Sequence, residues 1–437
     1  MQTNFSPELL ADPDMAVSES VIRKCVHCGF CTATCPTYVL LGDELDSPRG
    51  RIYLMKDLLE NQRTPTPEIV KHVDRCLSCL SCMTTCPSGV NYMHLVDHAR
   101  AYIEERYGRP WHERLFRVLL AQILPHQGRF RIALALARLA RPAIPLVEKV
   151  AVLRPMAAML AMAPRRVALR PANAPSPATG PRRGRIALLQ GCAEPVLRPE
   201  FRAATVRVLN RAGYDVVFAP GEVCCGALVH HLGREGAALE AARRNVDAWT
   251  REIDRGLTAI VITASGCGTT IKNYGFMLRN DAAYAAQAER VSALARDVSE
   301  LLAEIELPPG EGRGMTVAYH AACSLQHGQK VTDAPVRLLV GAGYSVRTPV
   351  EQHLCCGSAG TYNILQPEIA DALGARKVEN LARLAPDVIA TGNIGCAMQI
   401  GRRTGTPVVH TVELLDWALG GPPPQAMLSF QGKETTA

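Results

Sequence analysis

Short apolar runs alternate with helical apolar spacing along the second half of the chain. The runs in "GRIALLQGC" (184–192) and "LTAIVITASGC" (257–267) are typical of buried strands, and each ends at a cysteine. Between them, "EFRAATVRVLNRAGY" (200–214) has helical spacing and stops at Ala-Gly, and "DVVFAP" (215–220) is again strand-like. The pattern predicts an α/β unit whose strands are followed by cysteine-bearing loops.

This unit occurs twice. "LNRAGYDVV" (209–217) is echoed by "LVGAGYSVR" (339–347), and the turn in "EVCCGALV" (222–229) returns in "HLCCGSAG" (353–360). Three cysteines recur 131 residues later and a fourth recurs 129 residues later, which indicates duplication of a whole domain. The two sets are Cys192, Cys224, Cys225 and Cys267, then Cys323, Cys355, Cys356 and Cys396.

Each set of four cysteines is expected to converge on one point. Binding loops in open α/β sheets gather at the carboxyl ends of the strands, and the glycine after each Cys-Cys pair allows positive φ or close approach to a ligand. Buried cysteine also packs as a small hydrophobe, but packing does not explain eight cysteines in two matching frames. We therefore expect a metal or redox site in each repeat, with a further iron–sulfur cluster and zinc as open alternatives.

The other eight cysteines form a second internal repeat near the N-terminus. "CVHCGFCTATCP" (25–36) and "CLSCLSCMTTCP" (76–87) both follow C-x2-C-x2-C-x3-C-P, the bacterial ferredoxin run for [4Fe–4S] clusters. A structural zinc site is a poor match to this triple run. The fourth cysteine of each run ligates the partner cluster, so the predicted ligand sets are Cys25, Cys28, Cys31 and Cys86 for one cluster, and Cys76, Cys79, Cys82 and Cys35 for the other.

Length and composition set the domain organisation. The 437 residues are too many for one core, and 48% apolar with 20% charged residues is typical of a globular protein. The predicted fold is a multidomain α+β and α/β chain. Its expected parts are a helical ferredoxin-type domain with two clusters (1–100), a basic helical connector and linker (101–183), and two cysteine-rich α/β repeats (184–310 and 311–437).

The connector differs in charge from the rest of the chain. Residues 100–183 hold sixteen Arg and Lys against four Glu, a local net charge of +12, whereas the whole chain carries +7. The first interpretation is a helical connector with a solvated arginine face. The second is an amphipathic surface that faces anionic lipid or an acidic partner subunit. Nucleic acid is not expected as a partner, because only 5% of the residues are aromatic and no binding module is visible.

Location and nucleotide binding are predicted from what the sequence lacks. No stretch reaches about 18 apolar residues without a charge, and the acidic N-terminus has no apolar core typical of a secretory signal. We expect a cytoplasmic protein, with peripheral contact at the inner face of the cytoplasmic membrane as an alternative. No G-x-G-x-x-G opens a helix after a strand, so a nicotinamide or flavin site is not expected on this chain.

Five further side chains lie close to the cysteines in sequence. His230 and His231 follow the first Cys-Cys pair, and His320 precedes Cys323; ordinary loop or packing histidines are the favoured interpretation, and metal proximity the alternative. Arg49 and Arg51 lie between the ferredoxin runs. They are expected to be solvent-exposed, with hydrogen bonding near the clusters as the alternative.

Taken together, the motifs carry a family resemblance over nearly the whole chain. "CVHCGFCTATCPTYVLLGDELDSPRGRIYLMKDLLE" (25–60), "CLSCLSCMTTCPSGV" (76–90) and two Cys-Cys-Gly domains resemble the iron–sulfur subunits of bacterial glycolate oxidase. The resemblance implies a complex in which a separate FAD-binding subunit oxidises glycolate to glyoxylate. It also implies that this chain passes the electrons towards a quinone-type acceptor.

Related families remain alternatives. The architecture is similar to iron–sulfur subunits of lactate-utilisation systems, of anaerobic glycerol-3-phosphate dehydrogenase and of heterodisulfide reductase. In the last of these, each Cys-Cys-Gly domain ends in C-x2-C and can hold a non-cubane cluster. Here Ala264 and Asn393 stand where that fifth thiol would be, so the non-cubane cluster does not carry over. A catalytic disulfide or quinone reductase and a zinc-stabilised docking scaffold are the other hypotheses for this half.

Overall fold

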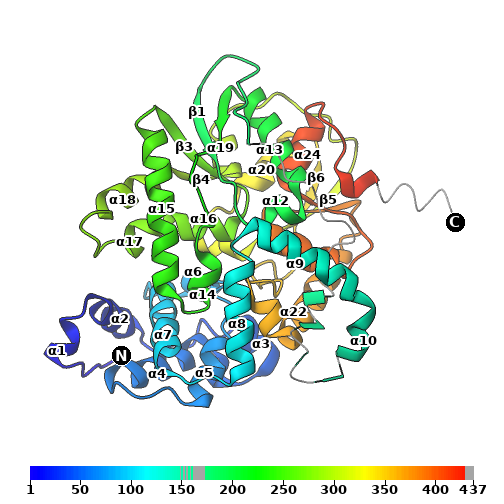
Figure 1. Cartoon of the computed structure of the whole chain (residues 1–437). Helices are drawn as coiled ribbons and strands as arrows, with labels where there is room; N and C mark the ends of the chain where they lie inside the picture. The colour runs from blue at the N-terminus through cyan, green and yellow to red at the C-terminus, as the bar shows by residue number, and fades with distance from the viewer. Residues whose placement is uncertain (148, 151–152, 154–155, 158, 161–172, 429–437) are drawn as a thin grey trace.

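The computed structural model describes residues 1–147, 149–150, 153, 156–157, 159–160 and 173–428. It contains a helical N-terminal domain, a helical connector and two α/β repeats, as predicted from the sequence. In Figure 1 the N-terminal helices lie at the bottom, and the two repeats lie side by side above them. The connector helices α8 and α9 run upward from the N-terminal domain and across the front.

The N-terminal domain is built from short helices with strong start signals. Four of its helices begin with proline directly after a Ser, Thr or Asp whose side chain accepts a backbone N–H, a pairing that favours helix initiation. The elements of this domain are α1 (Pro7–Leu10), α2 (Pro13–Lys24), α3 (Pro36–Leu41), η1 (Glu44–Asp46), α4 (Pro48–Glu60), α5 (Pro67–Asp74), α6 (Ser81–Thr85) and α7 (Tyr92–Arg106). Their apolar faces bury one core that includes Ile22, Met55, Leu58 and Leu95.

The connector begins with a pair of helices that lead away from this domain. Its described elements are α8 (Trp111–Ile123), α9 (Gln127–Ala140), η2 (Arg141–Ala143) and α10 (Ile144–Val147). The boundary expected at residue 100 falls within α7, and much of the basic stretch between 148 and 172 lies outside the described residues. Among the described residues, no helix combines the length and the apolar character that crossing a membrane requires.

Each repeat contains a four-stranded parallel sheet with the same strand order. The first sheet runs β2-β1-β3-β4 and the second β6-β5-β7-β8. The first sheet comprises β1 (Gly184–Leu188), β2 (Tyr214–Val217), β3 (Leu257–Ile262) and β4 (Ala295–Asp297). The second comprises β5 (Thr316–His320), β6 (Ser345–Arg347), β7 (Val388–Thr391) and β8 (Val408–His410). The predicted duplication is therefore a duplication of the whole sheet.

Helices connect the strands in both repeats. In the first they are α12 (Glu194–Leu197), α13 (Pro199–Arg211), α14 (Ala227–His231), α15 (Glu235–Ile253), α16 (Ser265–Lys272), α17 (Tyr274–Met277), α18 (Ala285–Leu294) and α19 (Val298–Ala303). In the second they are the π-helix η4 (Ser324–Gly328), α20 (Ala334–Gly341), α21 (Tyr362–Leu365), α22 (Pro367–Ala382), α23 (Ile394–Gly401) and α24 (Thr411–Ala418). These connections place the loops that follow β1, β2 and β3, and their counterparts, at one edge of each sheet.

The two repeats pack against each other by equivalent surfaces. The first long helix of one repeat contacts the last helix of the other, so α13 packs on α24 and α20 packs on α19. Side chains of both sheets and of these four helices form one shared core. This reciprocal arrangement is the pseudo-twofold contact expected when a duplicated domain pairs with its own copy.

The last helix of each repeat begins with a capping box. Asp297 caps α19 with Glu300 reaching back, and His410 caps α24 with Glu413 reaching back. The two carboxylates have different neighbours. Glu300 pairs with Lys272, whereas Glu413 is 97% buried and lies 3.7 Å from Arg198.

Candidate metal centres

The two ferredoxin runs line two adjoining pockets in the N-terminal domain. One pocket is lined by Cys25, Cys28, Cys31 and Cys86, and the other by Cys35, Cys76 and Cys79. Cys82 borders both. Each pocket thus receives the fourth cysteine of the opposite run, which is the exchange that the ferredoxin spacing predicts.

Both cysteine loops use the same unusual backbone. His27 and Ser78, at matching positions of the two runs, have φ values of 56° and 50°. Two residues later, Gly29 and Leu80 have φ values of 85° and 62°. Positive φ at the three non-glycine residues, His27, Ser78 and Leu80, costs free energy and is typical of loops whose shape serves a ligand. The repeated geometry wraps each loop around its pocket.

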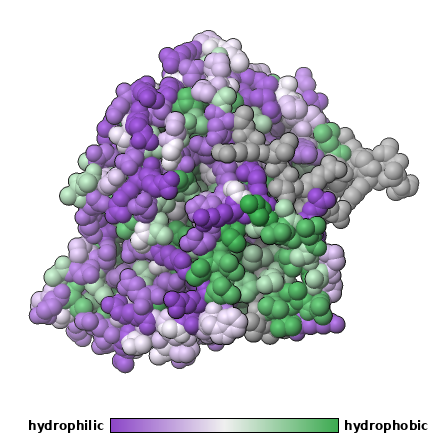
Figure 2. Space-filling model, in the orientation of Figure 1, coloured by the Kyte–Doolittle hydropathy of each residue, from purple (hydrophilic) through white to green (hydrophobic). Residues whose placement is uncertain are grey.

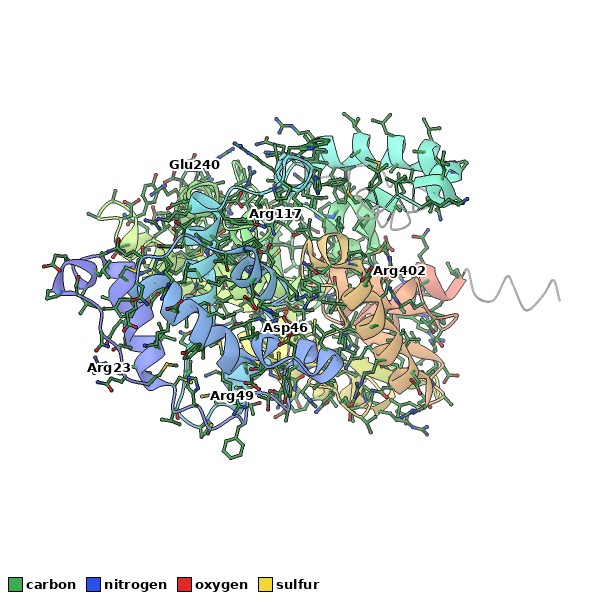
Figure 3. The ribbon with its side chains drawn as sticks, turned by 90° about the horizontal axis from the view of Figure 1, so that it is seen from below. Arg23, Asp46, Arg49, Arg117, Glu240 and Arg402 are labelled. Carbon is green, nitrogen blue, oxygen red and sulfur yellow. The ribbon has the colours of Figure 1, made fainter. Side chains whose placement is uncertain are left out.

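A buried acidic residue organises the segment between the runs. Asp46 is fully buried and accepts hydrogen bonds from Arg51 (3.0 Å) and Arg75 (2.8 Å), while His72 Nδ1 lies 3.0 Å from the same carboxylate. Three partners on a buried carboxylate compensate for its desolvation. Figure 3 looks onto this side of the molecule and labels Asp46 and Arg49.

The expectation that Arg51 is solvent-exposed is wrong. Its side chain is 1% exposed, and Nη1 lies 3.8 Å from the sulfur of Cys35. Tyr92 donates its hydroxyl to the sulfur of Cys76 at 3.8 Å on the same pocket. Arg49, in contrast, is partly exposed and pairs with Glu44. Hydrogen bonds to ligand sulfurs stabilise the thiolate and raise cluster potentials.

Burial makes these thiols unfavourable as isolated anions. It raises the pKa of Cys31 to about 11, and it raises the pKa of Cys79 and Cys82 well above the usual range, with neighbouring thiols adding to the effect. A positively charged metal centre at the middle of each set would reverse this penalty, because it would stabilise all the thiolates at once.

The cysteines of the first repeat converge as predicted from the strand–loop pattern. Cys192 follows β1, the pair Cys224 and Cys225 follows β2, and Cys267 lies in the first turn of α16 after β3. The sulfurs of Cys192 and Cys224 are 3.5 Å apart. Hydrogen bonding within this buried pair lowers the pKa of Cys224 and raises that of Cys192.

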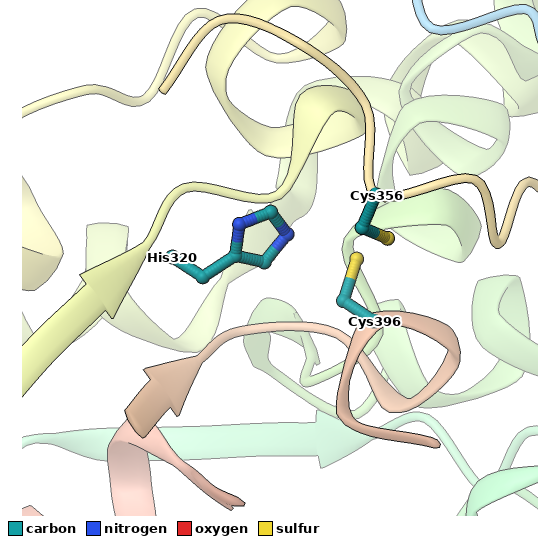
Figure 4. Close-up of side chains that lie close together, drawn as sticks. All are labelled: His320, Cys356 and Cys396. Carbon is teal, nitrogen blue, oxygen red and sulfur yellow. The ribbon is translucent and has the colours of Figure 1, made fainter. Parts of the chain in front are cut away.

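The second repeat repeats this arrangement. Cys323 and Cys355 have sulfurs 3.6 Å apart, and Cys396 lies in the first turn of α23 beside Cys356. His320, the last residue of β5, joins them: a ring nitrogen of His320 and the sulfurs of Cys356 and Cys396 all lie within 4.8 Å of one another. In Figure 4 the imidazole extends from the end of β5 toward the two thiols.

The glycine after each Cys-Cys pair is required by the fold. Gly226 and Gly357 both have φ of 86°, in the left-handed region. A Cβ at Gly226 would lie 3.1 Å from the carbonyl oxygen of Ala238, and one at Gly357 would lie 2.6 Å from that of Ala370. The glycine therefore brings each Cys-Cys loop against a long helix, which is α15 in the first repeat and α22 in the second.

The helix behind each Cys-Cys loop carries a different anchoring side chain. Asn245 of α15 accepts the N–H of Val223 at 2.8 Å and donates to the carbonyl of Cys224 at 3.2 Å. The corresponding position of α22 is Lys377, which is 2% exposed and donates to the carbonyl of Glu351 at 2.8 Å. The second site has a buried amine beside it where the first has a neutral amide.

The second repeat also adjoins the ferredoxin domain. Leu77 and Cys79 pack with Cys355 and Tyr362 in one apolar cluster, which Cys323 borders. Thr84 Oγ1 lies 2.7 Å from His327 Nδ1 across the same boundary. The cysteines of the second repeat are therefore direct neighbours of the second ferredoxin pocket.

His230 and His231 do not lie with the cysteines. Both face Asp97 of α7, with nitrogen–oxygen distances of 3.8 and 4.0 Å, and burial lowers the pKa of His231 to about 4. His230 and Asp97 also line a cavity of about 410 Å³ between the N-terminal domain and the first repeat. Sequence reasoning missed Asp97, because this residue is remote from both histidines along the chain.

The connector presents an apolar surface to solvent. The exposed side chains on α8 and α9 include large hydrophobic residues, namely Trp111, Leu115, Leu119, Ile132, Leu136 and Leu139. Figure 2 shows apolar atoms gathered on this side of the molecule. Arg117 turns the other way and pairs with Asp74 of the N-terminal domain at 2.7 Å. We call the six exposed residues the α8–α9 face; Arg114, Arg129 and Arg138 are also exposed on these two helices.

Two protein families match separate parts of the chain. The 4Fe-4S dicluster domain family matches residues 24–90, which contain both ferredoxin runs. The cysteine-rich CCG domain family matches residues 186–272 and 317–401, which contain the two four-cysteine sets. The matched ranges coincide with the pockets and loops described above.

Relatives match over almost the full length. The chain is 43% identical over 420 residues to the glycolate oxidase iron-sulfur subunit of Escherichia coli (strain K12), covering 96% of this chain and 99% of the relative. It is 30% identical over 427 residues to the probable glycolate oxidase iron-sulfur subunit of Bacillus subtilis (strain 168), covering 92% and 95%. A crystal structure of a hypothetical protein from Helicobacter pylori shares the fold, with a TM-score of 0.55, 11% identity, and coverage of 95% and 74%.

Proposed function

This chain belongs to the family of glycolate oxidase iron–sulfur subunits, and we propose that it carries single electrons from an FAD-binding partner subunit towards a quinone-type acceptor. The partner oxidises glycolate to glyoxylate in this proposal. The observation that carries it is the pair of adjoining cysteine pockets in the N-terminal domain, next to the cysteines of the second repeat.

The pockets fit two [4Fe–4S] clusters by the chemistry of their donors. We assign Cys25, Cys28, Cys31 and Cys86 to one cluster, and Cys76, Cys79, Cys82 and Cys35 to the other. When bound, such clusters accept and release one electron at a time without opening a ligand position. The protein supplies thiolates on shaped loops, and Arg51 and Tyr92 donate to two of the sulfurs.

The route proposed beyond these pockets leads to the second repeat. Cys79 and Cys355 belong to the same apolar cluster. The proposed ligands of the second ferredoxin pocket therefore lie next to those of the second repeat. We assign a further redox centre to Cys323, Cys355, Cys356 and Cys396, with zinc as the alternative occupant. The matching set Cys192, Cys224, Cys225 and Cys267 of the first repeat holds a fourth centre in this proposal.

The membrane is the proposed place of the acceptor. Trp, Leu and Ile side chains on a helix pair that also carries arginines are typical of helices that lie in the interface of a bilayer. The α8–α9 face has this composition, within a segment of net charge +12. We propose that it rests on anionic lipid at the inner face of the cytoplasmic membrane, which keeps the protein cytoplasmic but peripheral.

Co-sedimentation with vesicles tests the membrane contact. Vesicles containing phosphatidylglycerol should bind the full chain, and a Leu136→Glu and Leu139→Glu double variant should bind at least tenfold less. Vesicles of neutral lipid serve as the control for the arginine contribution. Equal binding of both proteins would reject the α8–α9 face as the contact, and would direct attention to the FAD-binding partner instead.

Substitution of a proposed ligand tests the electron route. In the assembled complex, Cys79→Ser should abolish reduction of a quinone analogue by glycolate but leave flavin reduction intact, since the flavin lies upstream. Stopped-flow absorbance separates these two steps. Loss of flavin reduction in a complex that still assembles would contradict the proposed order.

Metal analysis distinguishes the competing functions of the repeats. The anaerobically purified chain should hold about eight irons from the two N-terminal clusters, because each contains four. Additional iron supports redox centres in the repeats, whereas about two zinc ions per chain support a docking scaffold. A chain that binds no iron would overturn the proposed function as a whole.

A further inference from the structure

His320 is a buried histidine whose ring nitrogens lack hydrogen-bond partners among the described residues. The residue is 1% exposed, and neither Nδ1 nor Nε2 has a partner in the part of the chain that the structure describes. A buried polar group without a partner has lost its hydration without compensation, which destabilises the fold. Such groups in a native fold call for an explanation, of which a bound ion is one. The thiols of Cys356 and Cys396 lie within 4.8 Å of the ring.

Comparison with the first repeat shows that this histidine is specific to the second. The position that corresponds to His320, three residues before the first cysteine, is Leu189, an apolar side chain that is 5% exposed. The fold of the repeat therefore does not require an imidazole here. A leucine fills the place in one copy, so the histidine in the other copy calls for a chemical reason rather than a packing one.

The histidine also occupies the side of the site that lacks a fifth thiol. Asn393, at the position where a C-x2-C ending would place a cysteine, donates its Nδ2 to the sulfur of Cys396 at 3.4 Å. Asn393 thereby supports a ligand instead of providing one. His320 approaches the same cysteine from the end of β5, as Figure 4 shows.

We propose that His320 is a metal ligand of the second repeat, and that it binds iron of an iron–sulfur cluster together with the thiolates of Cys356 and Cys396. This inference rests on the proposed function, which assigns a redox centre to these cysteines. It makes the two repeats chemically different: the first site is all-thiolate, and the second is a mixed thiolate and imidazole site. A neutral imidazole in place of a thiolate raises the reduction potential of an iron–sulfur centre.

Pulsed EPR on the full chain tests the ligand directly. The anaerobically purified protein is reduced with dithionite, with histidine labelled by ¹⁵N in one sample and unlabelled in another. We expect a strong nitrogen hyperfine coupling that changes with the label, and its complete loss in His320→Leu, the residue of the first repeat. His320→Cys should retain the iron of this site but show no label-dependent coupling and a lower reduction potential.

His327→Gln is the matched control. His327 is also buried in the second repeat, but its ring nitrogens already have partners in Thr84 (2.7 Å) and the carbonyl of His353 (3.1 Å). This variant should keep the label-dependent coupling. Iron content and the circular dichroism spectrum of each variant show whether it has folded.

Three results would overturn the proposal. The first is a folded wild-type chain with intact iron in the second repeat and no histidine coupling; the second is a coupling that persists in His320→Leu. The third is zinc at this site, or no metal there, while the two N-terminal clusters remain visible by EPR; the proposed electron route through the N-terminal pockets would then stand without this ligand.

Discussion

Each of the two cysteine-rich repeats has the same type of sheet, a Cys-Cys-Gly loop and a capped last helix, but the side chains around the cysteines differ. Leu189, Ala264 and Asn245 surround the first set of cysteines, whereas His320, Asn393 and Lys377 surround the second. At each of the three positions the first repeat has an apolar or neutral side chain, and the second has one with greater capacity to bind a metal, to form a hydrogen bond or to carry a charge. Both copies have the same scaffold, and only the second has this polar environment.

The two repeats also differ in how close their cysteines lie to the ferredoxin pockets of the N-terminal domain. The second site adjoins Cys79, whereas the first repeat meets the N-terminal domain mainly around Asp97, His230 and the neighbouring cavity. The copy with the polar environment is thus the copy beside the ferredoxin pocket. This agreement between chemistry and position is why we assign the electron route to the second repeat.

The largest expected effect comes from removing one equivalent ligand in each repeat. Cys355→Ser should reduce metal affinity at its site by more than ~100-fold, since even outer-shell partners are worth about 10–100-fold, and should stop acceptor reduction. Cys224→Ser should empty the first site but leave acceptor reduction close to wild type. Iron content and steady-state quinone reduction are the measurements. If the two variants lose activity equally, the repeats are functionally equivalent and the comparison fails.

The next effect concerns pH and the two capping boxes. Burial raises the pKa of Glu413 to about 7, so its stabilising contribution is present below its unfolded value of 4.5 and is lost as the pH rises through 7. The corresponding loss in the free energy of unfolding between pH 5 and 8 is about 3 kcal/mol. Glu413→Gln keeps the capping box and should remove this part of the decline in urea unfolding, while Glu194 and Glu222, whose pKa burial also raises to about 7, keep theirs.

The matched control for this prediction is in the first repeat. Glu300→Gln removes a carboxylate that is already paired with Lys272, and should leave the decline of stability with pH unchanged. The same decline in Glu413→Gln as in wild type would show that another buried group is responsible.

A smaller effect is expected from the side chain behind each Cys-Cys loop. Burial lowers the pKa of the Lys377 amine and the nearby thiols of Cys356, Cys355 and Cys323 raise it. Lys377→Gln should lower the reduction potential of the second site by roughly 100 mV, as a unit charge several ångströms away contributes on the order of 2 kcal/mol. Asn245→Lys should raise the potential of the first site by a similar amount. EPR-monitored redox titration measures both reduction potentials. Unchanged potentials in both variants would show that the charge of Lys377 does not make the two sites differ.

The smallest effect comes from the contacts with the N-terminal domain. Thr84→Val removes the hydrogen bond to His327, and Asn273→Ala removes the one between Asn273 and His94 in the first repeat. Each should cost about 1 kcal/mol of stability in urea unfolding. Only Thr84→Val should slow acceptor reduction, because only that contact adjoins Cys79. Slower reduction in Asn273→Ala would indicate a second route through the first repeat.

The sequence predicted which cysteines lie together in both kinds of site, but not the other side chains that lie next to them. Spacing is enough for the ferredoxin runs, because a compact cluster imposes short loops on its ligands. Strand–loop alternation is enough for the Cys-Cys-Gly sites, because parallel strands deliver their loops to one edge. The prediction for Arg51 was wrong because this side chain is buried against Asp46. Asp46 in turn is contacted by His72 and Arg75, which are distant in sequence, so its burial could not be predicted from the local sequence.

His320 shows what a duplicated sequence can add to such reasoning. Alone, a histidine near a cysteine is weak evidence of a ligand. Aligned with Leu189 of the other copy, it becomes a polar substitution at a buried strand end. That comparison was available before the structure; the orphaned ring nitrogens and the distance to the thiols were not.

Gly226 and Gly357 have a consequence for how such chains diverge. Each is fixed by the carbonyl of a neighbouring helix and by positive φ, whatever the cysteines hold. A lineage that abandoned the metal would be free to replace the cysteines but would still be selected to keep the glycine. Descendants with an intact glycine and altered cysteines would therefore mark the loss of the cofactor without loss of the fold.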